Sequence, residues 1–264
     1  MNNGEGPDIL GVCEIENYYV LKELSKRFLS DLNYEIVHYE SPDPRGIDVG
    51  LLYKPKKVKF ISSEKITVPV ENRSRDILHT IFNVKNENLH VFINHWPSRR
   101  EGEAASEPRR IAAATVLRKK IDSLLFIDPK TNILVLGDFN DTPQNKSILL
   151  HLMASPFDCD SLSDVYPSNL FNTAYKKHIE GKGSYFFQKK FEMIDQIIIS
   201  KGLLDKKGLD YLCDFFEIIS NELNTTRSGK FKGAPYPTFG SGRYLGGYSD
   251  HFPVGAVLIY IDEK

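Results

Sequence analysis

The stretch from Ile133 to Pro143 (ILVLGDFNDTP) constrains the fold more than any other part of the chain. Its four leading apolar residues, 133–136, run without interruption, which predicts a strand covered on both faces. Gly137 allows a turn or a close backbone approach, and Asp138 and Asn140 follow where the strand ends. Because these two residues are two positions apart, their side chains point to one side of an extended chain. A carboxylate and an amide there suit a hard cation and a phosphate oxygen, although an Asx-rich turn after a core strand would use the same residues.

The composition is that of a globular domain. The chain has 264 residues, of which 41% are hydrophobic and 26% charged, so it can bury a sizeable core. Its net charge of -1 gives no global basic field that would indicate nucleic acid, yet a nuclease could still use a local basic patch and metal ions. No apolar run reaches membrane-spanning length. The three cysteines are an odd number without metal-type spacing, which predicts buried thiols rather than a disulfide framework.

The apolar patterns predict more strands than helices. Strands are expected at 9–14, 35–39, 47–53, 58–70, 76–84, 89–95, 133–136, 191–200 and 254–260. Helices are expected through residues 21–28, at 110–126 and at 146–153, whereas 154–190 and 221–247 read mostly as loops and short strands. No linker separates two cores, so we expect one α+β domain in which two packed mixed sheets are flanked by helices.

Polar residues that can take part in catalysis recur at the ends of these expected strands. They are Glu14, His95, Asp138 with Asn140, and Asp250 with His251, and Asp195 lies inside another expected strand. Side chains at such positions converge on one face of a sheet. A carboxylate inside an apolar strand needs a partner or a metal, whereas either histidine taken alone could have a structural role.

Five motifs resemble those of the endonuclease/exonuclease/phosphatase superfamily, and they occur in its order. They are CEIEN at 13–17, INHWPS at 93–98, GDFN at 137–140, IDQI at 194–197 and SDH at 249–251. The segments at 45–49 and 99–103 resemble its bacterial, endonuclease-like branch. The resemblance spans nearly the whole chain and implies a four-layer αββα sandwich with Mg²⁺-dependent cleavage of a phosphoester, with Mn²⁺ as a second candidate ion.

The resemblance also implies roles for the metal and proton-transfer residues. Glu14 would be the main metal ligand, and Asp250 a second carboxylate of the metal site or a support for the neighbouring histidine. His251 would transfer a proton or hydrogen-bond the phosphate, with Asp195 orienting its ring and raising its pKa.

The other implied roles concern water and phosphate. Asp138 would orient the attacking water, and Asn140 and His95 would bind phosphate oxygens and stabilise the transition state. Asn94, Arg99 and Arg100 are the candidate substrate-binding residues. The last two belong to a basic cluster with two further arginines at 109 and 110, for which a solvated face and a contact with a phosphate backbone are both open.

Two smaller questions stay open in the sequence. Trp96 could stack on a base or pack beneath its loop. Three other arginines could meet either the substrate or a carboxylate, namely Arg45, Arg73 and Arg75.

The chain departs from the family pattern at its N-terminus. Family members usually begin with a strand whose asparagine reaches the metal site, followed by a helix, whereas only eight residues precede Ile9. We therefore expect a single domain over residues 1–264 that lacks this first strand and helix. A missing upstream segment is the favoured explanation, and a misassigned gene start or a gap filled by dimerisation are the others. A signal peptide would be lost with that segment, so the sequence assigns no compartment.

Three functions remain open, in order of preference. The first is a metal-dependent nuclease or phosphodiesterase that uses in-line attack by water, with nucleic acid as its partner. The second is a phosphatase or phosphodiesterase acting on a small or lipid-linked phosphoester. The tryptophan motif of inositol 5-phosphatases is absent, because FEMID at 191–195 stands in its place. The third is a catalytically impaired member that serves as a binding or scaffold protein.

Overall fold

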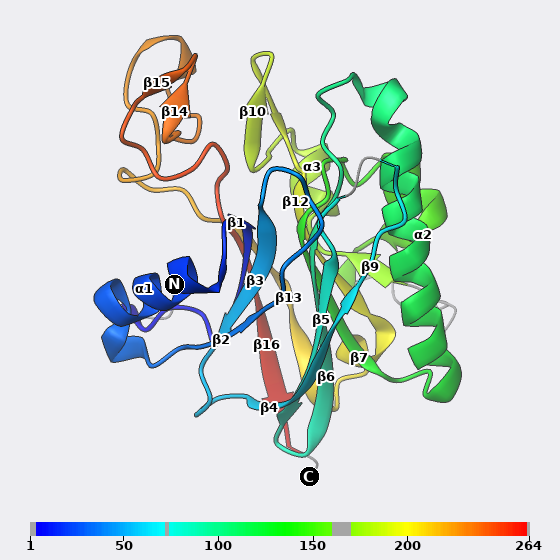
Figure 1. Cartoon of the computed structure of the whole chain (residues 1–264). Coiled ribbons are helices and arrows are strands. Elements are labelled where there is room, and N and C mark those ends of the chain that lie inside the picture. Colours follow the sequence, from blue (N-terminus) through cyan, green and yellow to red (C-terminus); the bar gives the residue numbers. More distant parts are fainter. Residues whose placement is uncertain (1–3, 72–73, 160–169, 263–264) are drawn as a thin grey trace.

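Two β-layers face each other across the main hydrophobic core, and a helix covers the outer face of each (Figure 1). The computed structural model describes residues 4–71, 74–159 and 170–262. Its larger sheet has seven strands in the order β4 (Lys59–Ile66), β5 (Ile77–Val84), β6 (Glu87–His95), β7 (Asn132–Asp138), β12 (Asp195–Ser200), β9 (Leu170–Asn172) and β8 (Ala154–Pro156). Within it only the pairs β6–β7 and β8–β9 are parallel among the described strands, so the sheet is mixed as predicted.

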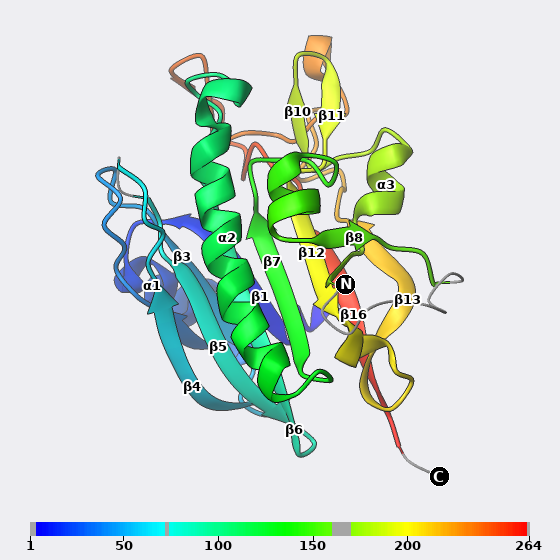
Figure 2. The same cartoon turned by 90° about the vertical axis from the view of Figure 1, so that its right-hand side faces the viewer.

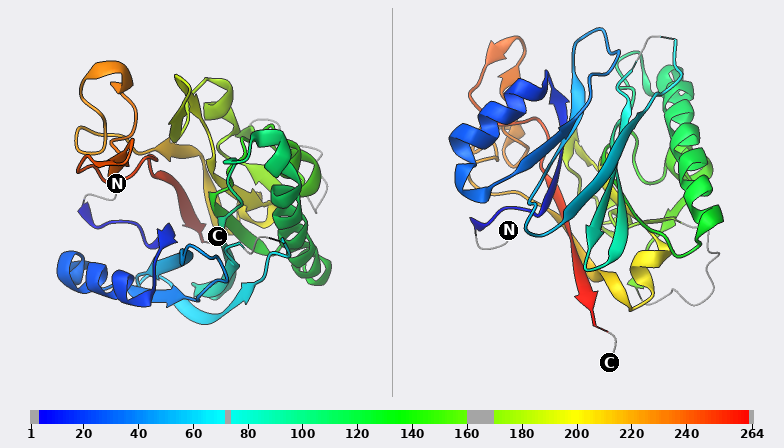
Figure 3. Two further views of the ribbon diagram at one scale, coloured as in Figure 1. Left: turned by 45° about the horizontal axis from the view of Figure 1, so that its top comes forward. Right: turned by 60° about the horizontal axis from the view of Figure 1, so that its bottom comes forward.

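The second layer consists of two separate parts. One is a three-stranded sheet in the order β1 (Ile9–Ile15), β3 (Asp48–Tyr53), β2 (Glu35–His38), and the other is the pair β13 (Gly208–Ile218) and β16 (Val254–Ile261). Both parts pack on the same core as the inner face of the larger sheet. Figure 3 shows them with β1 in dark blue and β16 in red.

The helices complete a four-layer arrangement, which confirms the predicted αββα sandwich. The helix α1 (Tyr18–Phe28) lays Leu21 against Leu52 on the outer face of the three-stranded sheet. On the opposite side α2 (Glu103–Ile127) packs against β7 and its neighbours (Figure 2). The short helix α3 (Tyr175–Ile179) lies near the hairpin of β10 (Tyr185–Phe187) and β11 (Lys190–Glu192), and β14 (Phe239–Gly240) pairs with β15 (Arg243–Tyr244). Among the described residues no helix is both long enough and apolar enough to cross a membrane.

The central strand β7 is covered unequally on its two faces. Ile133 and Val135 are fully buried beneath α2, but Leu134 and Leu136, which face the second layer, are only partly buried. The prediction of complete cover on both faces is therefore only half correct. The reason is that β1 packs over β6 and β7 while β16 packs over β12. In the part of the chain that the structure describes, no strand pairs with the outer edge of β1 or of β16, and the expected loss of a first strand and helix stays a prediction.

The helix α2 begins seven residues earlier than the predicted start at Arg110. Gly102 precedes it with a φ of 98°, and the Ser106 hydroxyl donates to the Gly102 carbonyl oxygen at 2.7 Å. The charge-rich segment 103–109 forms the first turns of the helix. Buried Arg110 stabilises them by donating to the Ser106 hydroxyl at 2.7 Å and to the carbonyl oxygen of Glu103 at 3.0 Å.

The predicted strand at 191–200 is in fact two strands. Its first part is β11, which pairs with β10 and with no other described strand, and its second part is β12 in the larger sheet. The chain passes between them at Ile194, whose carbonyl oxygen accepts a hydrogen bond from the backbone N–H of Phe139 at 2.9 Å. Asp195 is consequently the first residue of β12, not an interior one.

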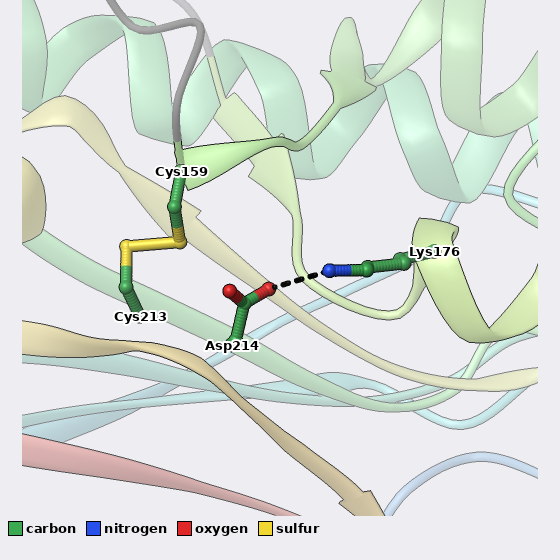
Figure 4. Close-up of a disulfide and its surroundings, with 4 residues drawn as sticks. All are labelled: Cys159, Lys176, Cys213 and Asp214. Atoms are coloured by element: carbon green, nitrogen blue, oxygen red, sulfur yellow. Dashed lines mark hydrogen bonds and ion pairs between the residues drawn. A yellow bond between two sulfur atoms is a disulfide. The ribbon is translucent and has the colours of Figure 1, made fainter.

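Two of the three cysteines form a disulfide, so the prediction that all three are free thiols is wrong. Cys159 follows β8 and is bonded to Cys213 in β13, with their Cα atoms 6.0 Å apart (Figure 4). Asp214, next to Cys213, accepts a hydrogen bond from Lys176 at 3.2 Å. The two cysteines are 54 residues apart in sequence, and only the packing of β8, β9 and β13 brings them together. Cys13 remains a free, partly buried thiol.

Gly137 is the residue on which the close pairing of β6 and β7 depends. Its φ is 136°, and a Cβ atom placed on it would lie 1.9 Å from the backbone oxygen of Asn94. We expect Gly137→Ala to lower the free energy of unfolding by about 3 kcal/mol or more, because strained backbone and a backbone collision add together. Gly181→Ala is the matched control, since Gly181 has a φ of 74° but open space around it, and it should cost about 1–2 kcal/mol. Equal losses of unfolding free energy for the two variants, measured by urea unfolding, would contradict the predicted collision at Gly137.

Candidate active site

Three of the predicted residues form a row across neighbouring strands at one end of the larger sheet. Parallel pairing of β6 and β7 puts His95 beside Asp138, and antiparallel pairing of β7 and β12 puts Asp195 opposite Asp138. The row arises because two strands end where the third begins. Residues from distant parts of the sequence, at 95, 138 and 195, thereby share one edge of the core.

His251 joins this row through Asp195. Its Nδ1 lies 2.6 Å from Oδ2 of Asp195, and the same oxygen accepts a hydrogen bond from the Ser184 hydroxyl at 2.6 Å. Burial disfavours the charged imidazole, but the negative charge and hydrogen bond of Asp195 outweigh it and raise the pKa of His251 to about 10. The structure therefore presents His251 as a cation with its ring held in one orientation.

Asp138 is a buried carboxylate with a raised pKa. Its burial, followed by the negative charge of Asp195, raises its pKa to about 7. Nε2 of His95 lies 3.6 Å from its Oδ2. Asn140, in a left-handed conformation with a φ of 49°, donates its backbone N–H to Oδ1 at 2.8 Å and its side-chain amide to Oδ2 at 3.1 Å.

Asn140 holds Asp138 in place. Its amide nitrogen donates both to Asp138 and, at 3.0 Å, to the carbonyl oxygen of Trp96. The predicted role of Asn140 in binding a phosphate oxygen stays a prediction.

One ring nitrogen of His95, Nδ1, is buried without a hydrogen-bond partner among the described residues. Burial, followed by the positive charge of Arg75, holds the pKa of His95 well below its usual value, so the ring is neutral at pH 7. Arg75 itself donates to the Trp96 carbonyl oxygen and, at 3.0 Å, to Asp43. Asp43 also binds Arg45, whereas Arg73 lies outside the described residues.

The prediction of Asn94 as a substrate-binding residue is wrong. Asn94 is fully buried, its Oδ1 accepts from the Trp96 indole at 3.0 Å, and its amide donates to the Phe92 carbonyl oxygen at 3.3 Å. Trp96 is likewise buried and packs edge-on against Phe139, with ring centroids 4.8 Å apart. Both residues pack inside the core next to the row, and the buried Trp96 ring is not available to stack on a substrate.

The two predicted metal ligands are exposed carboxylates beside the row. Glu14 occupies a β-bulge of β1 with a φ of 59°, an unusual conformation for a glutamate. The preceding thiol of Cys13 donates to the Asn94 carbonyl oxygen at 3.5 Å. Burial, followed by the charge of Asp138, raises the pKa of the Cys13 thiol. Cys13, and with it this end of β1, therefore lies close to the row. The charge of Asp250 raises the pKa of His251 and of Tyr185, so Asp250 lies beside them.

This donor set fits a divalent cation. Within the described part of the chain, the side chains of Glu14 and Asp250 form no hydrogen bond or ion pair, and both are exposed. Hard cations such as Mg²⁺ take one or two carboxylates from the protein and keep water and phosphate as their other ligands. Two exposed carboxylates without a protein partner in the described residues have this chemistry.

A second group of possible metal ligands lies on the other face of the three-stranded sheet. His38, Glu40 and Asp48 offer ligand atoms within 4.8 Å of one another. Asp48 already bonds His38 at 3.0 Å and accepts from the Ser41 backbone N–H at 2.7 Å. A Cβ on Gly50, two residues along β3, would touch both Leu21 of α1 and His38. The cluster therefore faces α1, away from the row.

Most of the predicted basic cluster is paired with carboxylates. Arg99 forms an ion pair with Glu192 of β11. The other two paired arginines are Arg109, with Glu101 at 2.8 Å, and buried Arg110, with Asp141 at 2.7 Å. Arg100 is exposed and has no ion pair within the described ranges. Arg99 thus connects the β10–β11 hairpin to the loop after β6, and a contact of Arg99 or Arg100 with a phosphate backbone stays a prediction.

Two residues of the site were missed by sequence reasoning. Ser184 fixes Asp195 through its hydroxyl, and Tyr185 places its ring 4.7 Å from that of His251. Both lie in the segment that read as loop and short strands, where no motif singles them out. Their contacts come from the isolated backbone bridge between Tyr185 and His251, which local sequence patterns do not contain.

Known structures share this fold. Zebrafish TDP2 complexed with a single-strand DNA product is 16% identical, with 96% of this chain and 86% of that chain covered and a TM-score of 0.60. The catalytic domain of human nocturnin with bound sulfate is 17% identical, with 95% of this chain and 81% of that chain covered and a TM-score of 0.56. A Bacteroides thetaiotaomicron mannosyl-6-phosphatase is 16% identical, with 96% of this chain and 85% of that chain covered and a TM-score of 0.59. At these identities the likeness shows the fold. No curated protein matches the chain by sequence.

The sequence itself settles the family. The family model described as "Endonuclease/Exonuclease/phosphatase family" matches residues 1–262, which is nearly the whole chain and includes every residue of the row. The chain therefore belongs to the endonuclease/exonuclease/phosphatase family and is a phosphoester hydrolase.

Proposed function

We propose that this chain is a divalent-cation-dependent nuclease or phosphodiesterase that cleaves a phosphodiester by in-line attack of water. The observation that carries the proposal is the row in which cationic His251 is held by Asp195, beside the buried carboxylate of Asp138. A fixed proton donor and a fixed proton acceptor at the same end of a sheet suit phosphoester hydrolysis. The similar fold of zebrafish TDP2, whose structure holds a single-strand DNA product, supports nucleic acid as the substrate.

Asp138 is the acceptor for the attacking water. Its pKa of about 7 leaves a substantial carboxylate fraction at neutral pH and makes it a better base than an exposed aspartate. The two hydrogen bonds from Asn140 hold the carboxylate in one orientation. A water bound to it is thereby directed rather than mobile, which lowers the entropy cost of the attack.

His251 and His95 act on the phosphate. Cationic His251 donates a hydrogen bond to a phosphate oxygen or passes its proton to the leaving oxygen, while Asp195 keeps the ring oriented. Neutral His95, beside Asp138 in the row, adds a hydrogen bond to a phosphate oxygen. Exposed Arg100 would bind the neighbouring phosphate of a chain substrate.

Glu14 and Asp250 would hold Mg²⁺ or Mn²⁺. When bound, the cation neutralises phosphate charge and stabilises the leaving oxygen. Their exposure leaves room for water and phosphate in the remaining coordination positions.

We expect Glu14→Gln to lower Mg²⁺-dependent hydrolysis of single-stranded DNA and of bis(p-nitrophenyl) phosphate by at least about 100-fold, because it removes a metal ligand. Chelation of the wild-type protein should have the same effect. Glu16→Gln is the matched control, because Glu16 is an exposed glutamate two residues further on, and it should keep wild-type activity. Full activity of Glu14→Gln at low Mg²⁺ would contradict the assignment.

We expect His251→Ala to reduce kcat on the same substrates by about 10²–10⁴-fold, the usual contribution of a general acid or base. His151→Ala, which changes a histidine in the π-helical turn Ser147–His151, should leave kcat unchanged. Thermal unfolding of both variants separates lost catalysis from lost folding. A folded His251→Ala variant with wild-type kcat would exclude His251 from the chemistry.

The same assays separate the other two functions. Release of phosphate from a monoester such as p-nitrophenyl phosphate, with no cleavage of DNA or of the diester, would favour a small-substrate phosphatase. Silence on every substrate, together with no binding of Mn²⁺, would favour a scaffold protein. Either result would overturn the proposal.

A further inference from the structure

The β10–β11 hairpin presents different aromatic residues on its two faces. Its turn residues, Gln188 and Lys189, have φ values of 46° and 66°, as in a two-residue hairpin turn. Phe186 turns toward an anchoring cluster, with its ring centroid 5.0 Å from Phe191 and 6.4 Å from Phe231. This cluster fixes the hairpin at the end of the sandwich that carries the row (Figures 1 and 2).

The other face carries a ladder of rings that starts at the catalytic histidine. Tyr185 and Phe187 lie on this face because strand residues alternate. The Tyr185 ring is 4.7 Å from His251, and the Phe187 ring is stacked on Tyr185 at 6.2 Å with an interplanar angle of 14°. Phe187 is 46% exposed, so the ladder runs from the row to the solvent and ends in a free aromatic surface.

Positive charge accompanies the ladder. Lys190 pairs with Phe187 across the hairpin, and both Lys190 and Lys189 are exposed. At the base of the hairpin, Arg99 binds Glu192 and links the hairpin to the loop that follows His95. An exposed ring flanked by lysines and connected to a phosphate-cleaving row matches how proteins bind single-stranded nucleic acid, in which bases stack on aromatic side chains and cations follow the backbone.

We propose that the Tyr185–Phe187 ladder is a base-stacking subsite for single-stranded nucleic acid, with Phe187 holding the base of a nucleotide next to the cleaved phosphate. This inference rests on the proposed nuclease function and adds the form of the substrate. A base must be unpaired to lie on Phe187, so single strands bind there and intact duplex does not. The ladder does not read sequence, because every base has a flat face.

The test measures binding in the presence of chelator, so that no cleavage occurs. Fluorescence anisotropy would compare a labelled oligothymidylate with an abasic oligonucleotide of the same length and charge. We expect the wild-type protein to bind oligothymidylate about tenfold more tightly, and Phe187→Ala to lose this preference while its affinity for the abasic strand is unchanged. Phe187→Tyr should restore the preference, and 2-aminopurine in the strand should be quenched only by variants that retain a ring.

Phe126→Ala is the matched control. Phe126 is 91% exposed near the C-terminal end of α2. That end of α2 lies far from the β10–β11 hairpin (Figure 1), so the loss of the Phe126 ring should change neither affinity. If the protein cleaves DNA but its binding preference for oligothymidylate over the abasic strand survives Phe187→Ala, this inference is overturned and the proposed nuclease function stands. Hydrolysis of small phosphoesters only, without binding of either oligonucleotide, would overturn both.

Discussion

Two carboxylates, Asp138 and Asp195, face each other across neighbouring antiparallel strands, and the site depends on how their charge is compensated. Like charges directly opposite in a sheet repel each other, and burial strengthens the repulsion because water no longer screens it. The protein responds in two ways. Burial, followed by the charge of Asp195, raises the pKa of Asp138 to about 7, and His251 from the C-terminal segment is the cation that Asp195 binds. Burial and the strand register together therefore set the acid and the base of the proposed reaction.

That register is maintained by polar contacts beneath the row. Gly137 lets the backbones of β6 and β7 approach more closely than any side chain would allow. Below it, Asn94 bonds the Trp96 indole, and Arg75 bonds the Trp96 carbonyl oxygen. These hydrogen bonds connect the buried groups to one another and hold the strand ends in fixed positions. The hairpin of Tyr185 is attached to the same region by Arg99 and by its backbone bridge to His251.

Local patterns in the sequence were sufficient to predict much of the sheet and of the row. The apolar run at 133–136 and the polar residues that end the strands indicated the sheet edge and most residues of the row, because strand ends and charge are visible in one segment at a time. What the sequence did not show depends on contacts between distant segments. The Cys159–Cys213 disulfide is one example. Asn94 is another, since its position beside a candidate histidine indicated substrate whereas its amide is used inside the core. The change of partner at Ile194, which makes Asp195 the first residue of β12, also requires knowledge of which strands pair.

We propose that a divalent cation binds to Glu14 and Asp250 in this phosphoester hydrolase. Anomalous scattering from crystals soaked in Mn²⁺ would locate the ion without relying on activity. We predict a single strong peak within coordination distance of the carboxylates of Glu14 and Asp250. A peak at His38, Glu40 and Asp48 instead, or no peak at saturating Mn²⁺, would exclude this metal site.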